Sequence, residues 1–432
     1  MKVFNKPNRQ YWRTLCQRPL LNQEDISETV LSLLEKVKTE GDKALIDCAK
    51  TFDKVELNSI TVSDKEIKAG INNVSDELKS AIKLANDNIY QFHFAQQSPK
   101  ELIETTKGVM CWRESRAIEK VGLYIPGGSA PLFSTLLMLG IPAKIAGCKE
   151  VVICTPPQQD GTISDAILYT ANLIGLDTIF KVGGAQAIGA MTYGTESIPQ
   201  VYKVFGPGNQ FVTKAKEICQ LDGIGIDMPA GPSEVLIIAD DSAIPAFVAA
   251  DLSSQAEHGP DSQVILLSTS QSLIDETINE LEKQLELLPR KEIAEKAIQN
   301  SKAILLENME LCFELSNAYA PEHLITAIDN KEDFLPMITN AGSVFIGNYS
   351  CESAGDYASG TNHTLPTNGY ARQYSGVSLD SFQKKITFQE LSENGILNIG
   401  PAVEIMAKTE QLLAHKNAMT LRLEYIKNKN NE

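Results

Sequence analysis

Histidine is scarce in this sequence, and most of it stands beside residues that bind metals or move protons. The 432 residues contain only five histidines. Four of them lie in short runs with Gln, Glu, Asp, Gly or Pro, namely His258, His323, His363 and His415. Imidazole nitrogens and carboxylate or amide oxygens are ligands that zinc accepts, and a catalytic zinc site keeps one position open. A fold that gathers these runs would form one metal-containing pocket.

The run from Asp251 to Pro260 is the centre of this pattern. It reads as the last turns of a helix that Gly259 and Pro260 bring to an end. Gln255 and His258 are three residues apart, so a helix places them on one face. The run therefore indicates half of a metal site. Taken alone, such a run is more often an ordinary polar helix end, and it gains meaning only beside the other histidines.

The elements that would position these residues begin at about residue 110. Short β-branched runs predict strands at 151–154, 178–182, 201–204, 234–238, 263–267, 303–306, 324–328 and 343–346. They alternate with helical segments such as 164–176 and 242–258. Alternation of this kind predicts parallel sheets with crossover helices. The Gly- and Pro-rich stretch at 229–232 divides the strands into two sheets.

The two ends of the chain have a different texture. Residues 1–20 are predicted as an irregular arm. An apolar stripe from Asn22 onward predicts a helix that stops at Gly41, and Ser75 is a natural cap for a second helix. The first hundred residues are therefore predicted as a mostly helical layer without chemistry of its own. Near the C-terminus, Pro401 is predicted to open one helix that continues toward Tyr425.

Three loops are rich in glycine and proline, at 121–131, 182–188 and 205–209. Glycine lets the backbone approach a ligand closely, and free N–H groups at a helix start suit a phosphate. The full G-x-G-x-x-G pattern of dinucleotide-binding folds is absent, since Gly206-Pro-Gly208 continues into Asn-Gln-Phe. Tight strand-to-helix turns explain these loops as well as a dinucleotide does. A fourth stretch, 223–234, leads into a predicted strand and would suit a hinge.

Composition restricts the class of partner. The net charge of −16 and the pI near 4.9 argue against nucleic acid and anionic membranes. The N-terminus lacks the apolar run of a signal peptide, and no stretch has the ~18 unbroken apolar residues of a membrane helix. The eight cysteines form no CxxC pair, which is typical of reduced thiols. We therefore expect a cytoplasmic protein with a small-molecule substrate.

Taken in order, these runs resemble the histidinol dehydrogenase family over about residues 20–426. The series consists of 226–234, then Gln255-Ala-Glu-His258, Pro321-Glu322-His323, 355–363 and His415-Lys-Asn. The resemblance implies an α/β fold of two Rossmann-like domains with an incomplete dinucleotide fingerprint, plus small N- and C-terminal helical segments. The implied division is 1–20 as an N-terminal arm, 21–119 as a helical layer packing with the second α/β domain, 120–232 and 233–375 as the two Rossmann-like domains, and 376–432 as a C-terminal dimerisation segment.

The resemblance also implies roles for individual residues. The zinc ligands would be Gln255, His258, Asp356 and His415. Glu322 and His323 would be the acid/base pair. The substrate would contact these ligands and His323 together with Ser233, His363 and Glu410, and NAD would contact Tyr124, Gln186 and Asn209. The family is an intertwined homodimer whose C-terminal segment reaches the partner's site. The implied reaction is the oxidation of L-histidinol through L-histidinaldehyde to L-histidine with two NAD molecules, the last step of histidine biosynthesis.

The chemistry of that reaction agrees with the residue types. Alcohol oxidation needs a base for the hydroxyl proton, and aldehyde oxidation first needs water to add; a histidine suits the first task and a neighbouring carboxylate the second. Three other classes remain open. A zinc hydrolase would use similar residues but would not need the three loops. A relative that oxidises another small alcohol, such as a sulfonated diol, is closer, although His363 and Glu410 suit an imidazole and an amine better. A binding or scaffold protein would have no use for these polar runs.

Overall fold

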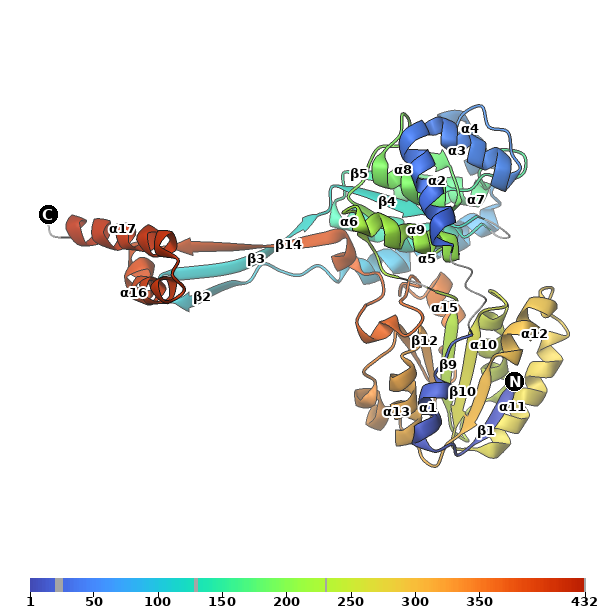
Figure 1. Ribbon diagram of the computed structural model, residues 1–432. Helices are drawn as coiled ribbons and strands as arrows, with labels where there is room; N and C mark the ends of the chain where they lie inside the picture. Colours follow the sequence, from blue (N-terminus) through green and yellow to red (C-terminus); the bar gives the residue numbers. More distant parts are fainter. Residues whose placement is uncertain (20–25, 128–130, 230, 431–432) are drawn as a thin grey trace. The chain divides into compact units, whose positions relative to one another are not determined.

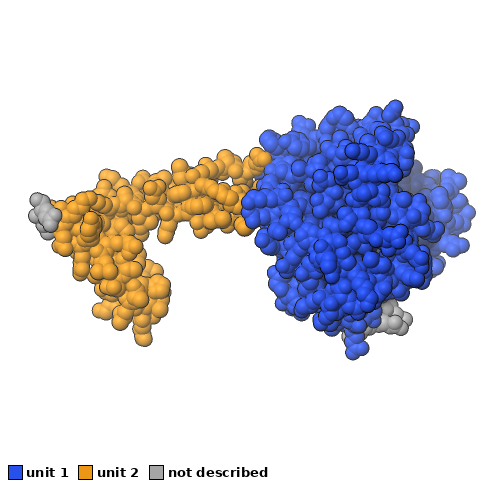
Figure 2. Space-filling model, turned by 90° about the horizontal axis from the view of Figure 1, so that it is seen from above, with its two compact units in different colours: residues 1–96, 118–382 blue, residues 97–117, 383–432 orange. Residues whose placement is uncertain are grey.

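The computed structural model describes residues 1–19, 26–127, 131–229 and 231–430. They form two compact units, which Figure 2 colours separately. Unit 1 comprises Met1–Gln96 and Ile118–Phe382, and unit 2 comprises Gln97–Ala117 and Gln383–Glu432. The predicted helix start near Asn22 and part of the loop at 121–131 lie outside the described residues. The five-part division that the family resemblance implies stays a prediction.

The first sheet of unit 1 has five parallel strands in the order β6-β5-β4-β7-β8. They are β4 (Lys120–Tyr124), β5 (Glu150–Thr155), β6 (Ile179–Lys181), β7 (Lys203–Phe205) and β8 (Gly225–Ile226). The central strands are nearly continuous runs of buried residues, because a parallel sheet is covered on both faces. The helices that alternate with these strands are α6 (Phe133–Ala146), α7 (Asp165–Ile174), α8 (Gly184–Tyr193) and α9 (Gln210–Leu221).

The helical layer of the first hundred residues packs on this first sheet. It consists of α2 (Ser27–Glu40), α3 (Asp42–Cys48), the π-helical turn η2 (Ala49–Asp53), α4 (Asp64–Asn73) and α5 (Asp76–Phe94). Val30, Leu34 and Val37 of α2 share one apolar cluster with residues of β5 and α8, and Ile82 and Ile89 of α5 pack with α6. The apolar stripes of this layer thus pack on the helices of the first α/β domain, whereas its contacts with the predicted second domain include polar ones, such as that from Asn88 of α5 to the Ala358 carbonyl oxygen at 2.9 Å.

The second sheet has six parallel strands in the order β1-β11-β10-β9-β12-β13. They are β1 (Lys2–Asn5), β9 (Glu234–Ala239), β10 (Gln263–Ser268), β11 (Lys302–Leu305), β12 (His323–Ala327) and β13 (Ser343–Ile346). The arm predicted as irregular thus contributes an edge strand, β1, which pairs with β11, followed by η1 (Arg9–Tyr11) and α1 (Trp12–Leu15). Figure 1 shows this N-terminal strand beside the second sheet.

The strands of the second sheet alternate with α10 (Pro245–Ala256), α11 (Gln271–Leu285), α12 (Lys291–Gln299) and α13 (Met309–Tyr319). After β13 come α15 (Glu352–Tyr357) and the short turns η4 (Tyr370–Arg372) and η5 (Leu379–Phe382); α14 (Lys331–Phe334) and η3 (Leu335–Met337) precede that strand. Strands β9, β10 and β11 extend in one direction across the sheet, whereas β12 returns to the other side of β9. The strand order therefore reverses between β9 and β12.

Unit 2 is an antiparallel sheet with two helices. Its strands are β2 (Leu102–Thr106), β3 (Val109–Ala117) and β14 (Gln383–Leu391), in the order β14-β3-β2, and its helices are α16 (Glu393–Thr409) and α17 (Leu413–Lys429). Helix was predicted for the last fifty residues, so β14 was missed, and no strand was predicted where β2 and β3 lie. One helix was also predicted to run from Pro401. Instead Pro401 lies inside α16, and the chain breaks at Gln411, whose φ is +61°.

The α/β fold with two parallel sheets is confirmed, and each of the eight predicted strands overlaps a strand of the structure. Ser75 caps α5 as predicted, since its side chain accepts the N–H of Leu78. Gly41 ends α2 with a φ of +57°, a conformation that glycine adopts without strain. Among the described residues, no helix is both long and apolar enough to cross a membrane.

Candidate active site

Glu322 and His323 lie where β12 enters the second sheet. Glu322 is buried, and its Oε2 accepts the backbone N–H of Glu234 at 2.8 Å. Nδ1 of His323 is 3.1 Å from the Glu234 carbonyl oxygen and 3.5 Å from Oε2 of Glu322. Both oxygens are acceptors, and they favour a proton on Nδ1 and a lone pair on Nε2 of the neutral ring. The Gln255 amide nitrogen, 3.2 Å from the same Nδ1, is itself a donor and does not bond to Nδ1 in this tautomer. This is the tautomer in which Nε2 can act as a base.

Two carboxylates control the charge of this ring. Burial disfavours the protonated form, but Glu322 and Asp356 together outweigh it and raise the pKa of His323 well above its ordinary value. Oδ1 of Asp356 is 3.3 Å from Nε2 of His323, on the side of the ring opposite Glu322. With both carboxylates ionised, the ring binds its proton tightly.

Asp356 lies on α15 between two histidines. Burial opposes its ionisation, but His323, whose Nε2 is 3.3 Å away, and the positive charges that His323, His363 and His258 carry when protonated hold the pKa of Asp356 below its ordinary value. Nδ1 of His363 is 2.8 Å from the Asp356 carbonyl oxygen, and Nε2 of His363 is 3.2 Å from Oγ1 of Thr135 on α6. Burial lowers the pKa of His363, so this ring is neutral at physiological pH.

Gln255 is the next-to-last residue of α10, and only 1% of it is exposed. Its Nε2 is 3.2 Å from Nδ1 of His323, whereas its Oε1 has no hydrogen-bond partner among the described residues. His258 is exposed in the turn that follows, and its backbone N–H donates to the Gln255 carbonyl oxygen at 3.3 Å. The buried, unpaired amide oxygen is an unusual feature that a ligand would explain.

The remaining candidate residues lie in two places. Ser233 directly precedes β9, next to the Glu234 backbone that holds Glu322. Glu410 and His415 belong to unit 2, where Glu410 follows α16 and His415 is an exposed residue of α17. Glu410 and His415 are therefore not part of the cluster in unit 1. That cluster consists of Gln255, Glu322, His323, Asp356 and His363. Within the described ranges, no group of three or more His, Cys, Asp or Glu side chains has the spacing of a metal site.

The three predicted NAD contacts lie at the carboxyl edge of the first sheet. Tyr124 ends β4, and its hydroxyl accepts the N–H of Gly184 at 3.1 Å. Gln186 is buried in the first turn of α8. Asn209 caps α9, because its Oδ1 accepts the N–H groups of Phe211 and Val212 at 3.0 and 3.1 Å. Tyr124 ends β4, and Gln186 and Asn209 follow β6 and β7, which lie on either side of β4 in the same sheet.

Two packing features shape this edge. Gly206 has a φ of +130°, and a Cβ at that position would lie 2.1 Å from the Tyr124 carbonyl oxygen, so only glycine fits. A buried ion pair between Lys216 and Asp227 holds the same loop, since Lys216 donates to the Gly206 carbonyl oxygen and Asp227 accepts the Gly206 N–H. A cavity of about 600 Å³ opens beside it, with Asp53, Gly127, Pro156 and Asp160 among its lining residues.

One acidic residue of the site was missed by the sequence analysis. Glu352 of α15 is buried, and burial raises its pKa to about 8 against the opposing effects of His323, Ser254 and Gln255. Its Oε1 accepts from the Ser254 hydroxyl, whereas its Oε2 has no hydrogen-bond partner among the described residues. Its position four residues before Asp356 was the available signal, because that spacing puts both carboxyl groups on one helix face.

Known proteins are similar to this chain in sequence and in fold. A family model described as histidinol dehydrogenase matches residues 16–423. A histidinol dehydrogenase of Bacteroides fragilis (strain YCH46) is 57% identical over 427 residues, which cover 99% of this chain and 100% of the relative. The crystal structure of histidinol dehydrogenase from Elizabethkingia anophelis is 60% identical, has a TM-score of 0.97, and covers 99% of each chain.

A more distant structure shows the fold alone. An acetylating aldehyde dehydrogenase from Geobacillus thermoglucosidasius is 13% identical, with a TM-score of 0.50 over 88% of this chain and 94% of that chain. The family match and the two similar proteins extend over nearly the whole sequence, including both sheets of unit 1 and most of unit 2. The chain therefore belongs to the histidinol dehydrogenase family of oxidoreductases.

Proposed function

We propose that this enzyme oxidises L-histidinol through L-histidinaldehyde to L-histidine, the last step of histidine biosynthesis, with NAD as electron acceptor and one zinc ion per subunit. The observation that carries the proposal is the convergence of Gln255, Glu322, His323 and Asp356 from three separate elements of unit 1. Family membership makes an alcohol dehydrogenase of histidine biosynthesis the expected activity.

A zinc ion fits the donor atoms of this site. The amide oxygen of Gln255 is buried and has no hydrogen-bond partner among the described residues, and Asp356, whose pKa is lowered, contacts the same His323 ring at Nε2. Gln255, His258 and Asp356 of one unit together with His415 would hold the ion. Zinc, when bound, would orient the imidazole and amine groups of the substrate. Once a cation shares its charge, Asp356 raises the pKa of His323 less, which leaves this ring better suited to act as a base.

His323 is assigned as the base in both oxidation steps. Its Nδ1 is fixed by the Glu234 carbonyl oxygen, so Nε2 takes the hydroxyl proton of the alcohol and later that of the hydrated aldehyde. Glu322 is assigned to activate the water that hydrates the aldehyde, because it is a carboxylate directly beside this ring. Ser233, His363 and Glu410 are proposed to contact the substrate. The carboxylate of Glu410 would pair with its ammonium group.

NAD, when bound, takes the hydride of each oxidation step. Tyr124, Gln186 and Asn209 are the proposed contacts, and their place at the carboxyl ends of parallel strands is where open α/β sheets bind such ligands. The loops after β6 and β7 lead into α8 and α9 without the standard glycine fingerprint. Binding would therefore depend on individual side chains more than on a phosphate-binding loop.

A homodimer with shared sites is part of the proposal. Large apolar side chains of unit 2 are exposed in the single chain, namely Ile405, Met406, Leu413, Leu421 and Tyr425. Exposed apolar surface of this kind is typical of protein interfaces. If the partner subunit covers this surface, His415 and Glu410 would complete the partner's site. We expect the dimer to act in the cytoplasm.

The direct test measures NADH formed from L-histidinol by the purified enzyme, with and without a chelator. We expect two NADH for each histidinol consumed, loss of activity in the chelator, and recovery when zinc is returned. His323→Ala should bind zinc and L-histidinol but lower kcat by about 10²–10⁴-fold. If NADH forms with a sulfonated diol but not with L-histidinol, the proposed substrate is wrong. If His323→Ala turns over at the wild-type rate, His323 is not the base.

A further inference from the structure

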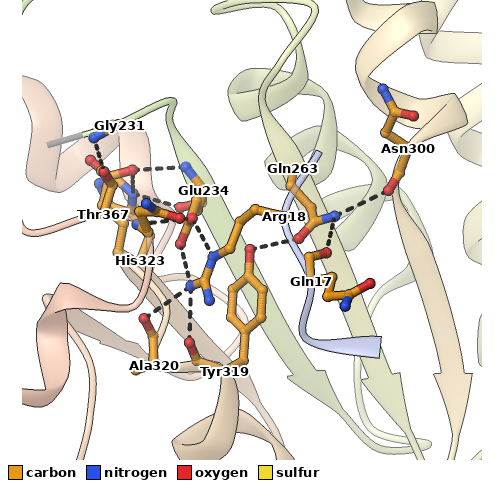
Figure 3. Close-up of polar contacts among 12 residues, drawn as sticks. Gln17, Arg18, Gly231, Glu234, Gln263, Asn300, Tyr319, Ala320, His323 and Thr367 are labelled. Atoms are coloured by element: carbon orange, nitrogen blue, oxygen red, sulfur yellow. Dashed lines mark hydrogen bonds and ion pairs between the residues drawn. The ribbon is translucent and has the colours of Figure 1, made fainter. Parts of the chain in front are cut away.

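Arg18 of the N-terminal arm forms a buried, two-pronged ion pair with Glu234 at the start of β9. Its Nε donates to Oε1 of Glu234 at 2.8 Å, and its Nη2 donates to Oε2 at 2.9 Å. The two side chains are 16% and 2% exposed. Figure 3 shows the guanidinium group between Glu234 and Tyr319. Arg18 therefore crosses from the arm, a segment without predicted chemistry, to the strand beside the candidate base.

The same guanidinium group also holds the chain just before the catalytic pair. Nη2 of Arg18 donates to the carbonyl oxygen of Tyr319 at 2.9 Å and lies 3.4 Å from that of Ala320, and its carbon is 3.8 Å from the centre of the Tyr319 ring. Ala320 has a φ of +56°, an unfavourable conformation for a residue with a Cβ. Only Pro321 separates this residue from Glu322. The strained turn that presents Glu322 and His323 is thus stabilised by Arg18.

Glu234 connects Arg18 to both members of the pair. Its backbone N–H donates to Oε2 of Glu322, and its carbonyl oxygen accepts from Nδ1 of His323. Oε1 of its side chain also accepts the N–H of Asn368 at 3.0 Å. The side chain of Glu234 is therefore held by Arg18, while its backbone contacts the two residues proposed to act on the substrate.

Stability alone is a poor reason for such a pair. Removing two charges from water costs free energy that their attraction often fails to return, and apolar residues of similar size are frequently as stable. What a bidentate pair provides is a defined geometry, which requires the planar fork of arginine. A lysine would keep the charge but could not bind both carboxylate oxygens and the Tyr319 carbonyl oxygen in one fixed arrangement.

From these contacts we infer that Arg18 is a positioning residue for the reaction, acting through Glu234 and the 319–321 turn to hold Glu322 and His323 in their working geometry. The inference rests on the proposed roles of Glu322 and His323. In this role Arg18 acts through other residues, since its hydrogen bonds go to Glu234 and to the 319–320 backbone. Errors of about 1 Å in the placement of catalytic groups can lower rates by about 10²-fold, so a small displacement of the turn is sufficient to be measured.

The test compares Arg18→Lys and Arg18→Met with a matched control, Arg9→Met. Arg9 is in the same arm but forms an exposed pair with Glu314. Measured for each variant are kcat, the KM values for L-histidinol and NAD, bound zinc and the midpoint of thermal unfolding. We expect Arg18→Lys to lower kcat by about 10- to 100-fold with both KM values and zinc content close to wild type. Arg9→Met should leave all five quantities unchanged.

Arg18→Met leaves a buried carboxylate unpaired and is expected to unfold more easily, so Arg18→Lys and the neutral double variant Arg18→Met/Glu234→Gln decide the matter. A lower unfolding midpoint with wild-type kcat in both would overturn the inference, because it would show a purely structural pair. A rise in KM with unchanged kcat would overturn it as well. His323→Ala is measured alongside: its failure to lose activity would refute the proposed base, whereas its loss beside fully active Arg18 variants would refute only the role of Arg18.

Discussion

At the scale of single residues, the two nitrogen atoms of the His323 ring have different partners. Nδ1 is turned toward the Glu234 carbonyl oxygen and Glu322, and Nε2 is turned toward Asp356. Glu322 therefore has two roles. It accepts a hydrogen bond from the Glu234 backbone, and its charge raises the pKa of His323. Substitution by glutamine separates them, because an amide oxygen can still accept the backbone N–H while the charge is lost.

We predict that Glu322→Gln slows oxidation of L-histidinaldehyde more than oxidation of L-histidinol, because the hydrating water loses its activating carboxylate. The measurement is the rate of NADH formation from each of the two substrates. Glu352→Gln is the control, since Glu352 is another buried carboxyl group near the same ring; it should affect both oxidations equally. Equal losses in Glu322→Gln would contradict a special role in hydration.

The individual site residues could be named from the sequence only through their family resemblance. The spacing of Gln255 and His258 predicted a shared helix face. Gln255 does end a helix next to the ring of His323, whereas His258 follows the helix in an exposed turn. Neither the approach of Asp356 to that ring nor the burial of Glu352 follows from local pattern, because both depend on α15 packing beside β12. The assigned roles stay predictions.

At the scale of elements, the turn before β13 limits the space around Glu322. Gly342 donates its N–H to the Pro321 carbonyl oxygen at 3.0 Å. A Cβ at this glycine would lie 2.5 Å from the Glu322 carbonyl oxygen, a backbone atom that cannot move without shifting β12. The close approach of β12 and β13 therefore fixes the backbone position of Glu322 and His323.

We predict that Gly342→Ala lowers both stability and kcat, because the added methyl group displaces the Glu322 backbone. The expected loss in the free energy of unfolding is about 1–3 kcal/mol, as for overpacking elsewhere, and it is measured by denaturant unfolding beside a kcat assay. Gly225→Ala serves as the milder control, since the nearest atoms to its Cβ would be Cγ of Lys203 at 3.1 Å and the Tyr202 carbonyl oxygen at 3.3 Å, farther than the Glu322 carbonyl oxygen is from a Cβ at Gly342. Wild-type kcat in Gly342→Ala would show that the turn tolerates displacement.

Most of the buried parallel strands were predictable, and the exposed antiparallel ones were not. The buried strand β4 was missed, because its residues were assigned to the glycine- and proline-rich loop at 121–131. Strands such as β9 and β12 are buried at every position, so their apolar runs are unmistakable. In β3 and β14 most side chains are partly or fully exposed, and polar residues interrupt any alternation. The break after α16 was missed for a similar reason: Gln411 adopts the left-handed conformation there without the usual glycine marker.

At the scale of the whole molecule, the two candidate sets of residues belong to different units. Five proposed site residues come together in unit 1, whereas Glu410 and His415 are in unit 2 with its exposed apolar side chains. A homodimer that exchanges unit 2 between subunits would give each site residues from both chains. This exchange makes a specific prediction for mixed dimers.

We predict that mixing inactive His258→Ala and His415→Ala subunits restores activity. In a hybrid dimer with shared sites, one site contains both wild-type histidines and the other contains neither. Random exchange would therefore restore about a quarter of the wild-type sites, as expected for a two-fold dimer. Each variant alone, carried through the same unfolding and refolding, is the control. No recovery after exchange has been verified by mass would show that each chain builds its own site.

The direction of the strands determines which helix ends lie at each sheet edge, and these ends favour ligands of opposite charge. The base and the Gln255 amide are at the amino edge of the second sheet, where α10 ends and its macrodipole presents a partial negative charge. At the carboxyl edge of the first sheet, α8 and α9 begin and present partial positive charge. The backbone alone thus favours a metal and a diamine-like substrate at one edge and a pyrophosphate at the other, before any side chain is considered.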